Sequence, residues 1–273
     1  MHVSPHILHC LLYSVGREDY YGKGIVYIMD NTIKIAATGL ASRTQSINLT
    51  SNNLSNIETA GYKHSEIVSS TFGEYITYRI DEESQIVGST TYGSVINKVY
   101  TDFSQGTITE TNQTLDFALD GNGFFTVSDN AGNTMLTRDG RFSVDDNGFL
   151  VDINSNFVMG QKGRINVGSS AISVSESGVI TSGGNIIDIL QITVPEDTAQ
   201  IYKLSDSMLF NPNGNTMNFT GKVIQGSIEK ANVDLTDEMA AMIEDSRAFQ
   251  TCSQIVRMAD QLLQKTVTEV GRV

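Results

Sequence analysis

The chain has 273 residues, enough for one large domain or two ordinary ones, and 40% of them are hydrophobic, which is enough for a buried core. A formal net charge of −13, with only 18 Lys and Arg, argues against an extended nucleic-acid surface, because phosphate binding needs clustered cations. Two widely separated cysteines, Cys10 and Cys252, argue against a disulfide framework.

Residues 1–28 are interpreted as a start-site extension or a disordered tail, because regular patterning begins at Met29. The first 15 residues contain a short apolar patch but no basic region, and no small-residue cleavage site follows, which argues against a secretory signal. No apolar run in the chain reaches the ~18–20 residues that cross a bilayer. A metal site here is not predicted, since no CxxC or HExxH motif accompanies the possible ligands His2, His6, His9 and Cys10.

Residues 29–63 are predicted to be an N-terminal helical segment that forms part of an assembly core. Apolar residues alternate at spacings of four and three, which is a heptad seam. The helix is expected to end near Ile57, because Gly61 supplies a turn. The seam residues of this segment that we expect to pack between subunits are Ile33, Leu40, Ile47 and Leu54.

The stretch TSNNLSNIETAGYK, residues 50–63, has a polar side made of short amides and hydroxyls, with only one acid and one base. Such side chains suit hydrogen bonding between close-packed neighbours better than contact with bulk water. We therefore expect Asn52, Asn53 and Asn56 to lie at packed interfaces, with Gly61 turning the chain outward. The alternative is an ordinary polar surface on a two-helix hairpin.

Residues 64–225 are predicted to be a central β domain with its connecting segment. From about residue 100, short runs rich in Val, Ile, Thr and Phe alternate with Asp-Gly and Asn-Gly dipeptides, which are typical of hairpins. This pattern indicates an antiparallel β sandwich or a barrel-like domain. The Asx-Gly stretches at 139–140 and 145–148 resemble fragments of calcium loops, but the full loop spacing is missing, so turns explain them better.

Residues 226–273 are predicted to contain a C-terminal helix of the assembly core, at about 235–270. Asp237 and Glu238 lie in its first turn, where the helix dipole favours acids. A second apolar row, Ala241, Ala248, Ile255 and Leu262, runs beside the heptad positions. The heptad residues expected to pack between subunits are Met242, Phe249, Val256 and Leu263. The predicted fold class is α+β, in which the N- and C-terminal helices pack as a coiled coil and flank a central antiparallel all-β domain.

The sequence predicts no enzyme and no cofactor. No GxSxG, P-loop or glycine-rich strand-to-helix turn occurs, and single acids beside Asp-Gly turns do not make a catalytic pair. His64 has no Cys or second His nearby and is expected to be a surface or interface residue.

Four stretches in order resemble the bacterial flagellar axial family, whose members build the rod and the hook. They are NNLSNIETAGYK at 52–63, SQGTITETNQTLDFALDGNGFFTV at 104–127, TRDGRFSVDDNGFLVD at 137–152 and GKVIQGSIEKANVDLTDEMAAMIEDSRAFQTCSQIV at 221–256. Within the family, FGEYI at 72–76 and the following TYGSVINKVYTDFSQG look most like the proximal rod members. A distal rod or hook-type axial subunit is the alternative.

The resemblance implies a structural subunit that is exported unfolded by the flagellar type III apparatus without a cleaved signal peptide. It implies self-assembly, with the distal rod protein and other rod subunits, into a hollow tube in the periplasmic part of the basal body. That tube transmits torque for motility. The implied partners include neither nucleic acid nor an inserted membrane segment.

Two hypotheses from other functional classes find no support in the sequence. A β-sandwich adhesin or carbohydrate-binding module would need an exposed aromatic platform, yet the chain has no Trp. A peptidoglycan-cleaving enzyme would need a general acid with a raised pKa in a cleft, and no feature of the sequence indicates one.

Overall fold

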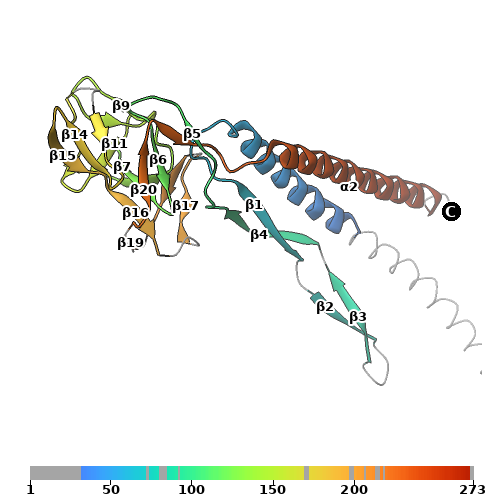
Figure 1. Cartoon of the computed structure of the whole chain (residues 1–273). Helices are drawn as coiled ribbons and strands as arrows, with labels where there is room; N and C mark the ends of the chain where they lie inside the picture. Colours follow the sequence, from blue (N-terminus) through green and yellow to red (C-terminus); the bar gives the residue numbers. More distant parts are fainter. Residues whose placement is uncertain are drawn as a thin grey trace, which may run out of the picture. The chain divides into compact units, whose positions relative to one another are not determined.

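The computed structural model describes residues 32–71, 74–79, 85–91, 93–168, 172–196, 200–205, 207–212, 216–217 and 219–270. The expected extension, residues 1–28, with its histidines and Cys10, lies outside these ranges. The chain divides into two compact units. Unit 1 comprises residues up to Leu49, Ile67–Val99 and the chain from Ala240, and unit 2 comprises Thr50–Glu66 and Tyr100–Met239. The fold combines helices with antiparallel sheets, as the sequence indicates (Figure 1).

Two long helices are present in the described chain. The N-terminal helix covers residues 32–55, and its end is followed by a turn at 56–58. The C-terminal helix α2 covers Leu235–Val270, which confirms the range expected from the heptad pattern. Asp234 caps α2, because its Oδ1 accepts hydrogen bonds from the backbone N–H groups of Thr236 at 2.7 Å and Asp237 at 3.3 Å.

Short two-stranded sheets make up the β structure of unit 1. Strand β2 pairs with β3 in antiparallel register, and a bulge interrupts the register between Thr77 and Tyr78. Strands β1 and β4 form the other sheet, and their ends run into unit 2. The bounds of these strands are β1 Ser65–Thr71, β2 Glu74–Arg79, β3 Gln85–Thr91 and β4 Ser94–Thr101.

Unit 2 is built on a sheet whose main path runs β17-β18-β8-β7-β11-β10-β9, with β12, β16 and β19 attached to it. Its strands are β7 Phe124–Ser128, β8 Thr134–Thr137, β9 Ser143–Val144, β10 Leu150–Val151, β11 Phe157–Gly160, β12 Gly163–Arg164, β16 Ile192–Pro195, β17 Tyr202–Lys203, β18 Met208–Phe210 and β19 Thr216–Met217.

Three smaller sheets complete unit 2: β13-β14-β15, β20-β6 and β21-β5. Their strands are β5 Ile108–Glu110, β6 Phe117–Asp120, β13 Ile172–Val174, β14 Val179–Ser182, β15 Asn185–Ile189, β20 Lys222–Gln225 and β21 Ser227–Glu229. Strands β20 and β21 precede α2 in the chain but pair with β6 and β5, so the segment that leads to the C-terminal helix belongs to the β unit.

The hairpin signals of the sequence were right at some turns and wrong at others. The Asn147-Gly148 signal was right, because the loop 145–149 joins β9 and β10 as an antiparallel hairpin. Strands β7 and β8 also form a hairpin, but the turn after Asp129 contains no Asp-Gly or Asn-Gly dipeptide. The Asp-Gly-Asn-Gly stretch at 120–123 does not make a hairpin, because β6 pairs with β20 while β7 pairs with β8 and β11. Here the dipeptides turn the chain from one sheet into another.

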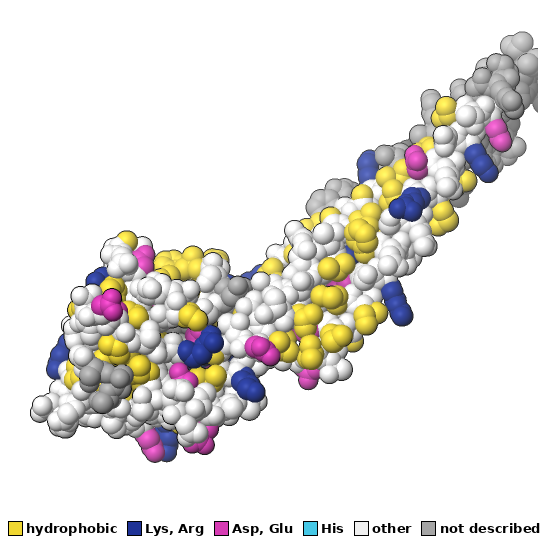
Figure 2. Space-filling model, turned by 90° about the horizontal axis from the view of Figure 1, so that it is seen from above, with side chains coloured by type: hydrophobic (Ala, Val, Ile, Leu, Met, Phe, Trp, Pro, Cys, Tyr) yellow, Lys and Arg dark blue, Asp and Glu magenta, His cyan; other side chains and the backbone are white. Residues whose placement is uncertain are grey.

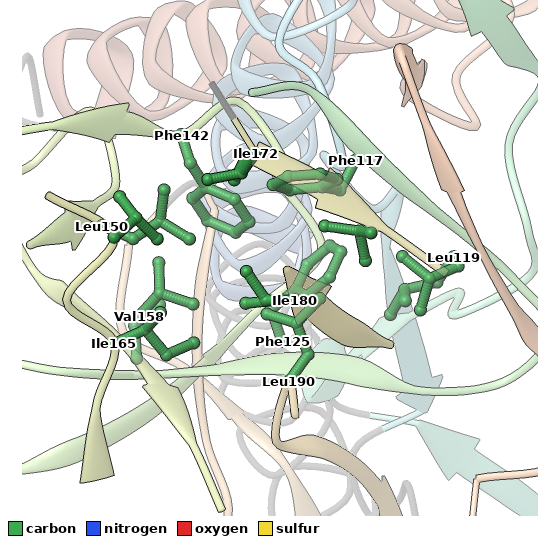
Figure 3. Packing of buried hydrophobic residues seen from close by; sticks show 14 of the residues in the cluster. Phe117, Leu119, Phe125, Phe142, Leu150, Val158, Ile165, Ile172, Ile180 and Leu190 are labelled. Atoms are coloured by element: carbon green, nitrogen blue, oxygen red, sulfur yellow. The ribbon is translucent and has the colours of Figure 1, made fainter. Parts of the chain in front are cut away.

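The core of unit 2 consists of one large cluster of apolar side chains and a smaller one around Phe124, Leu136 and Leu209. Phe125 is fully buried and lies edge-on to Phe142, with ring centroids 5.2 Å apart. Figure 3 shows Phe117, Ile180 and Leu190 facing the same interior as these rings. Burying aromatic and aliphatic side chains is the main driving force for folding, so this cluster makes unit 2 the stable body of the chain.

Candidate assembly surfaces and the junction that anchors them

The asparagine-rich stretch at the end of the N-terminal helix is held by hydrogen bonds inside unit 2. Asn53 is only 1% exposed. Its Nδ2 donates to the Ser65 carbonyl at 2.9 Å and to Glu238 Oε1 at 3.3 Å, and its Oδ1 accepts from the Ser65 N–H at 3.2 Å. A buried amide with donors and acceptors all in use stabilises a single conformation, because any displacement would leave polar atoms unpaired.

Tyr62 closes the same network from the other side. The fully buried side chain places its hydroxyl 2.8 Å from Asn52 Oδ1 and 2.9 Å from Asn53 Oδ1. Lys203 lies over the Tyr62 ring, with Nζ 3.7 Å from the ring centroid, and also donates to the Lys63 carbonyl at 3.3 Å. This cation–π contact ties edge strand β17 to the motif.

Asn56 ends the helix and shapes the turn that follows. Its Nδ2 donates to the Asn52 carbonyl at 3.0 Å, and its Oδ1 accepts from the Thr59 hydroxyl at 3.0 Å. Asparagine and threonine side chains commonly replace the missing backbone partners at helix ends. The helix therefore stops two residues before Ile57, the end expected from the apolar pattern.

Gly61 is required by its backbone conformation and by its neighbours. Its φ is +68°, and a Cβ at this position would collide with the backbone of Arg138 and Asp139. Its N–H donates to the Glu229 carbonyl at 2.8 Å. The glycine thus lets three distant parts of the sequence meet at backbone distance.

A buried ion cluster of Lys63, Arg138 and Glu229 lies beside this glycine. Lys63 Nζ is 2.7 Å from Glu229 Oε1, and Arg138 Nε is 2.6 Å from Glu229 Oε2. The Lys63 and Arg138 side chains are 4% exposed and that of Glu229 is 1% exposed. Burial lowers the pKa of Lys63 from its ordinary value, although the charge of Glu229 opposes the shift.

Backbone groups satisfy the remaining polar atoms of the cluster. Lys63 Nζ also donates to the Ser104 carbonyl at 2.6 Å, and Glu229 Oε1 accepts from the Gly106 N–H at 2.9 Å. The Arg138 guanidinium donates to three carbonyls, those of Leu119, Gly121 and Gly123. The carboxylate lies between two cations and every polar atom of the cluster is hydrogen-bonded, so these interactions offset the free-energy cost of removing the charges from water.

The first turn of α2 is fixed to the same motif. Glu238 Oε1 lies 2.7 Å from His64 Nε2 and accepts the longer bond from Asn53 already described. The His64 N–H donates to Asn232 Oδ1 at 2.7 Å, and Asn232 Nδ2 donates to the Asp102 carbonyl at 3.0 Å. Unit 2 therefore holds the end of the N-terminal helix and the start of α2.

A pocket of about 390 Å³ lies next to the ion cluster, lined in part by Lys63, Asp102, Phe103, Arg138 and Met217. Three of the charged residues that line it have partners within the chain: Glu229 for Lys63 and Arg138, and Ser104 for Asp102. Within the described residues, no group of three or more His, Cys, Asp and Glu is placed to hold a metal ion. The described part of the chain also contains no helix long and apolar enough to cross a membrane.

In unit 1 the two helices contact each other through polar and small residues. Arg43 NH1 lies 2.6 Å from Asp245 Oδ1, and a Cβ on Gly39 would lie 3.5 Å from the Cys252 sulfur. The heptad residues of both helices are only partly covered: Phe249 is 37% exposed, and the half-buried members are Ile33, Leu40, Ile47, Met242, Val256 and Leu263. Leu54, whose expected role is the same, is half-buried in unit 2.

Exposed apolar side chains are frequent on α2. Besides Phe249 they include Met239, Ile243, Met258, Leu262 and Val267, with Leu262 59% and Val267 71% exposed. Figure 2 shows hydrophobic side chains following one another along the surface of the helical part. A monomer rarely keeps so much apolar helix surface in water without a partner.

The twelve residues predicted to pack between subunits thus fall into two groups. The heptad residues of the helices keep open surface, whereas Asn52, Asn53, Asn56 and Gly61 make contacts inside their own chain. Whether either group also meets another subunit stays a prediction. Sequence reasoning missed the cluster of Lys63, Arg138 and Glu229; charged residues inside otherwise β-forming stretches were the available signal.

The described chain thus combines a β unit with buried apolar clusters and two long helices whose apolar side chains are partly open to solvent. Two family models match the chain: "Flagellar hook protein FlgE/F/G D1 domain" over residues 118–207 and "Flagellar basal body rod FlgEFG protein C-terminal" over residues 224–269.

Similar curated proteins agree with these models. The chain is 31% identical over 259 residues to the flagellar basal-body rod protein FlgG of Buchnera aphidicola subsp. Baizongia pistaciae, covering 85% of this chain and 96% of that protein. It is 28% identical over 256 residues to FlgG of Bacillus subtilis, covering 84% of this chain and 95% of that protein. It is 24% identical over 250 residues to FlgF of Caulobacter vibrioides, covering 90% and 100%. The chain belongs to the family of flagellar basal-body rod proteins.

Proposed function

We propose that this chain is a structural subunit of the proximal rod, which self-assembles with other rod subunits into a hollow axle that transmits torque. Its partners are copies of itself, the distal rod protein and the export apparatus, which passes it to the periplasmic rod without a cleaved signal peptide. The family supports a rod subunit. The proximal position rests on the sequence at 72–76 and 91–106, and a distal or hook-type position is the alternative.

The observation that carries the proposal is the difference between the two units. Unit 2 buries two apolar clusters, although single side chains such as Ile186 are exposed on it. The large apolar side chains of α2 in unit 1, such as Phe249 and Leu262, belong to neither cluster and stay open to solvent. A tube built from repeated head-to-tail contacts needs such open helix surfaces on several sides, because each subunit meets different neighbours through different faces. We propose that the terminal helices complete a coiled-coil core only when neighbouring subunits cover these faces.

Substitutions in the heptad seams test assembly. Leu40→Asp and Phe249→Asp place a carboxylate where the proposed tube buries an apolar side chain, so motility should be lost while unit 2 still folds. Gln254→Asp is the matched control for α2, since Gln254 is exposed and is not a heptad residue. Normal swimming and normal basal bodies in both seam variants would overturn the proposal.

The position along the rod requires a direct view. Cryo-electron microscopy of isolated basal bodies, with the chain carrying a small tag in an exposed loop of unit 2, should place it between the motor and the distal rod. Density at the distal rod or in the hook would replace the proximal assignment with the alternative while leaving the axial function intact.

A further inference from the structure

The two helices of unit 1 meet in an antiparallel arrangement at two contacts. Gly39 approaches Cys252, and Arg43 forms an ion pair with Asp245. The contact further along the N-terminal helix, at residue 43, involves an earlier residue of α2, 245 instead of 252, so the two helices run in opposite directions. The side chain of Arg43 is 47% exposed, but that of Asp245 is only 8% exposed, so the acid lies within the contact and the arginine reaches over it.

The other residues known to lie at this contact or to be buried on the two helices of unit 1 are small. On α2 the positions one heptad apart are Asp245, Cys252 and Ala259, and the buried residue of the facing helix nearest its start is Ala36. Small residues let two helices approach closely, but one small pair packs much like the next. At the junction the hydrogen bond from Asn53 to Glu238 already sets one lengthwise alignment of the two helices. Further along them, within unit 1, the alignment needs another group that is satisfied at one position only.

The charges of the N-terminal helix supply that condition. Residues 32–55 contain two cations, Lys34 and Arg43, and no acid. A slip of one heptad in one direction would bring Asp245 opposite Thr50, with no cation between 44 and 55. A slip in the other direction would bring it opposite Ala36, and Lys34 is two residues away, about 200° around the helix.

We propose that the Arg43–Asp245 ion pair is a register lock, which holds the lengthwise alignment of the two terminal helices within unit 1, beyond the junction. In either slipped alignment the buried carboxylate would lose its partner, which costs far more than an exposed charge does. The inference goes beyond the proposed function, because the lock acts inside a single chain whatever its place in the axis. It determines which heptad residues of the two helices lie side by side.

Native Cys252 gives a direct way to measure this alignment. In the full chain with Cys10→Ser, the substitution Gly39→Cys places a thiol beside Cys252 in the observed alignment, at a separation that a disulfide can close with a small shift. Ser46→Cys, one heptad further along, reports the slipped alignment instead. After mild oxidation, mass spectrometry of the non-reduced monomer gives the yield of each intrachain disulfide.

With both charges present, the Gly39→Cys reporter should form the disulfide and the Ser46→Cys reporter should form little. Arg43→Ala should lower the ratio of the two yields by about tenfold or more, as expected for a buried acid that loses its partner. Arg43→Asp combined with Asp245→Arg should restore the ratio. Arg247→Ala, which removes an exposed charge of α2, should leave it unchanged.

Three results would overturn the lock. The first is an unchanged ratio in Arg43→Ala, and the second is a Gly39→Cys reporter that forms no disulfide in the chain with both charges present. The third is equal loss of both disulfides in Arg43→Ala while circular dichroism shows unit 2 folded, because the pair would then hold the helices together without aligning them. None of these results depends on swimming or rod assembly, so a failure of the proposed function would appear separately.

Discussion

Tyr62 and Asn53 are joined by a hydrogen bond of 2.9 Å between the tyrosine hydroxyl and the asparagine Oδ1, in a place closed to solvent. The same Oδ1 accepts the Ser65 N–H, so side chain and backbone converge on one atom. The stretch between the N-terminal helix and the β body is therefore a folded junction, and its polar side chains act on their own chain before any neighbour arrives.

Tyr62→Phe should weaken this junction measurably. Removing the hydroxyl takes away the donor shared by Asn52 Oδ1 and Asn53 Oδ1. A buried acceptor that loses its hydrogen bond lowers the free energy of unfolding by about 1–3 kcal/mol. Urea denaturation of the purified chain followed by circular dichroism measures the free energy of unfolding. Tyr100→Phe is the control, since Tyr100 is largely exposed and should change stability by less than about 0.5 kcal/mol. Equal stability of the two variants would contradict the network.

Glu229→Gln should be among the most damaging substitutions in unit 2. It leaves Lys63 and Arg138 buried without a counter-charge, and breaking a buried ion pair by removing one partner costs about 3–5 kcal/mol. The measurement is again the free energy of unfolding. Glu176→Gln is the matched control: its partner Lys222 and Glu176 itself are mostly exposed, so the loss should be far smaller than that of Glu229→Gln. A Glu229→Gln loss no larger than the control's would show that the cluster does not hold the junction.

Gly61→Ala tests whether the close approach at the junction matters in addition to the backbone angle. An alanine would adopt an unfavourable φ and would also collide with the Arg138 backbone. The free energy of unfolding should therefore fall by more than about 2 kcal/mol. Gly183→Ala separates the two effects, because its φ of +59° is similar and no atom lies within 4 Å of the new Cβ. That control should lose only about 1–2 kcal/mol. Similar losses would leave the backbone angle as the whole explanation.

How much of this could be anticipated depends on the range of the interaction. The heptad spacing of Met242, Phe249 and Val256 is local, and it predicted α2 to within a residue. The ion pairs of Glu229 join positions 91 and 166 residues apart in sequence, and no local pattern reports such a meeting. The Asp-Gly signal at 120–121 failed for a related reason. It specifies a turn, but the pairing of β6 with β20 is decided by residues a hundred positions away.

The cap of α2 gives a prediction for pH. Hydrogen bonds from the Thr236 and Asp237 N–H groups hold the pKa of Asp234 below its usual range. The charged carboxylate is therefore the form that stabilises the fold. Its contribution is fully present above the ordinary value of 3.8 and is lost as the pH falls through the lowered value. Asp234→Asn keeps a capping oxygen that does not titrate.

Comparison of the two proteins isolates that carboxylate. The stability of the unchanged chain relative to Asp234→Asn should fall as the pH drops below 3.8, as measured by urea midpoints between pH 5 and pH 2. Carbon-detected NMR should give the titration of Asp234 directly. Asp234→Ala should lose the cap at neutral pH as well, whereas the Asn variant should not. If the difference in stability between the unchanged chain and Asp234→Asn stays constant from pH 5 to pH 2, the charged Asp234 carboxylate does not stabilise the start of α2.

Limited proteolysis should reveal the junction as part of the β body. A boundary drawn from the sequence alone places the central domain at 64–225, but the contacts of Asn53 and Glu229 bind both flanking stretches into unit 2. Trypsin should therefore cut early after exposed Arg43 and Arg247 and spare Lys63 and Arg138, whose side chains are 4% exposed. Mass spectrometry of the digest identifies the cuts. Early cleavage after Lys63 would mean that the junction opens in the free chain, and Glu229→Gln should produce that cleavage if the ion cluster is what closes it.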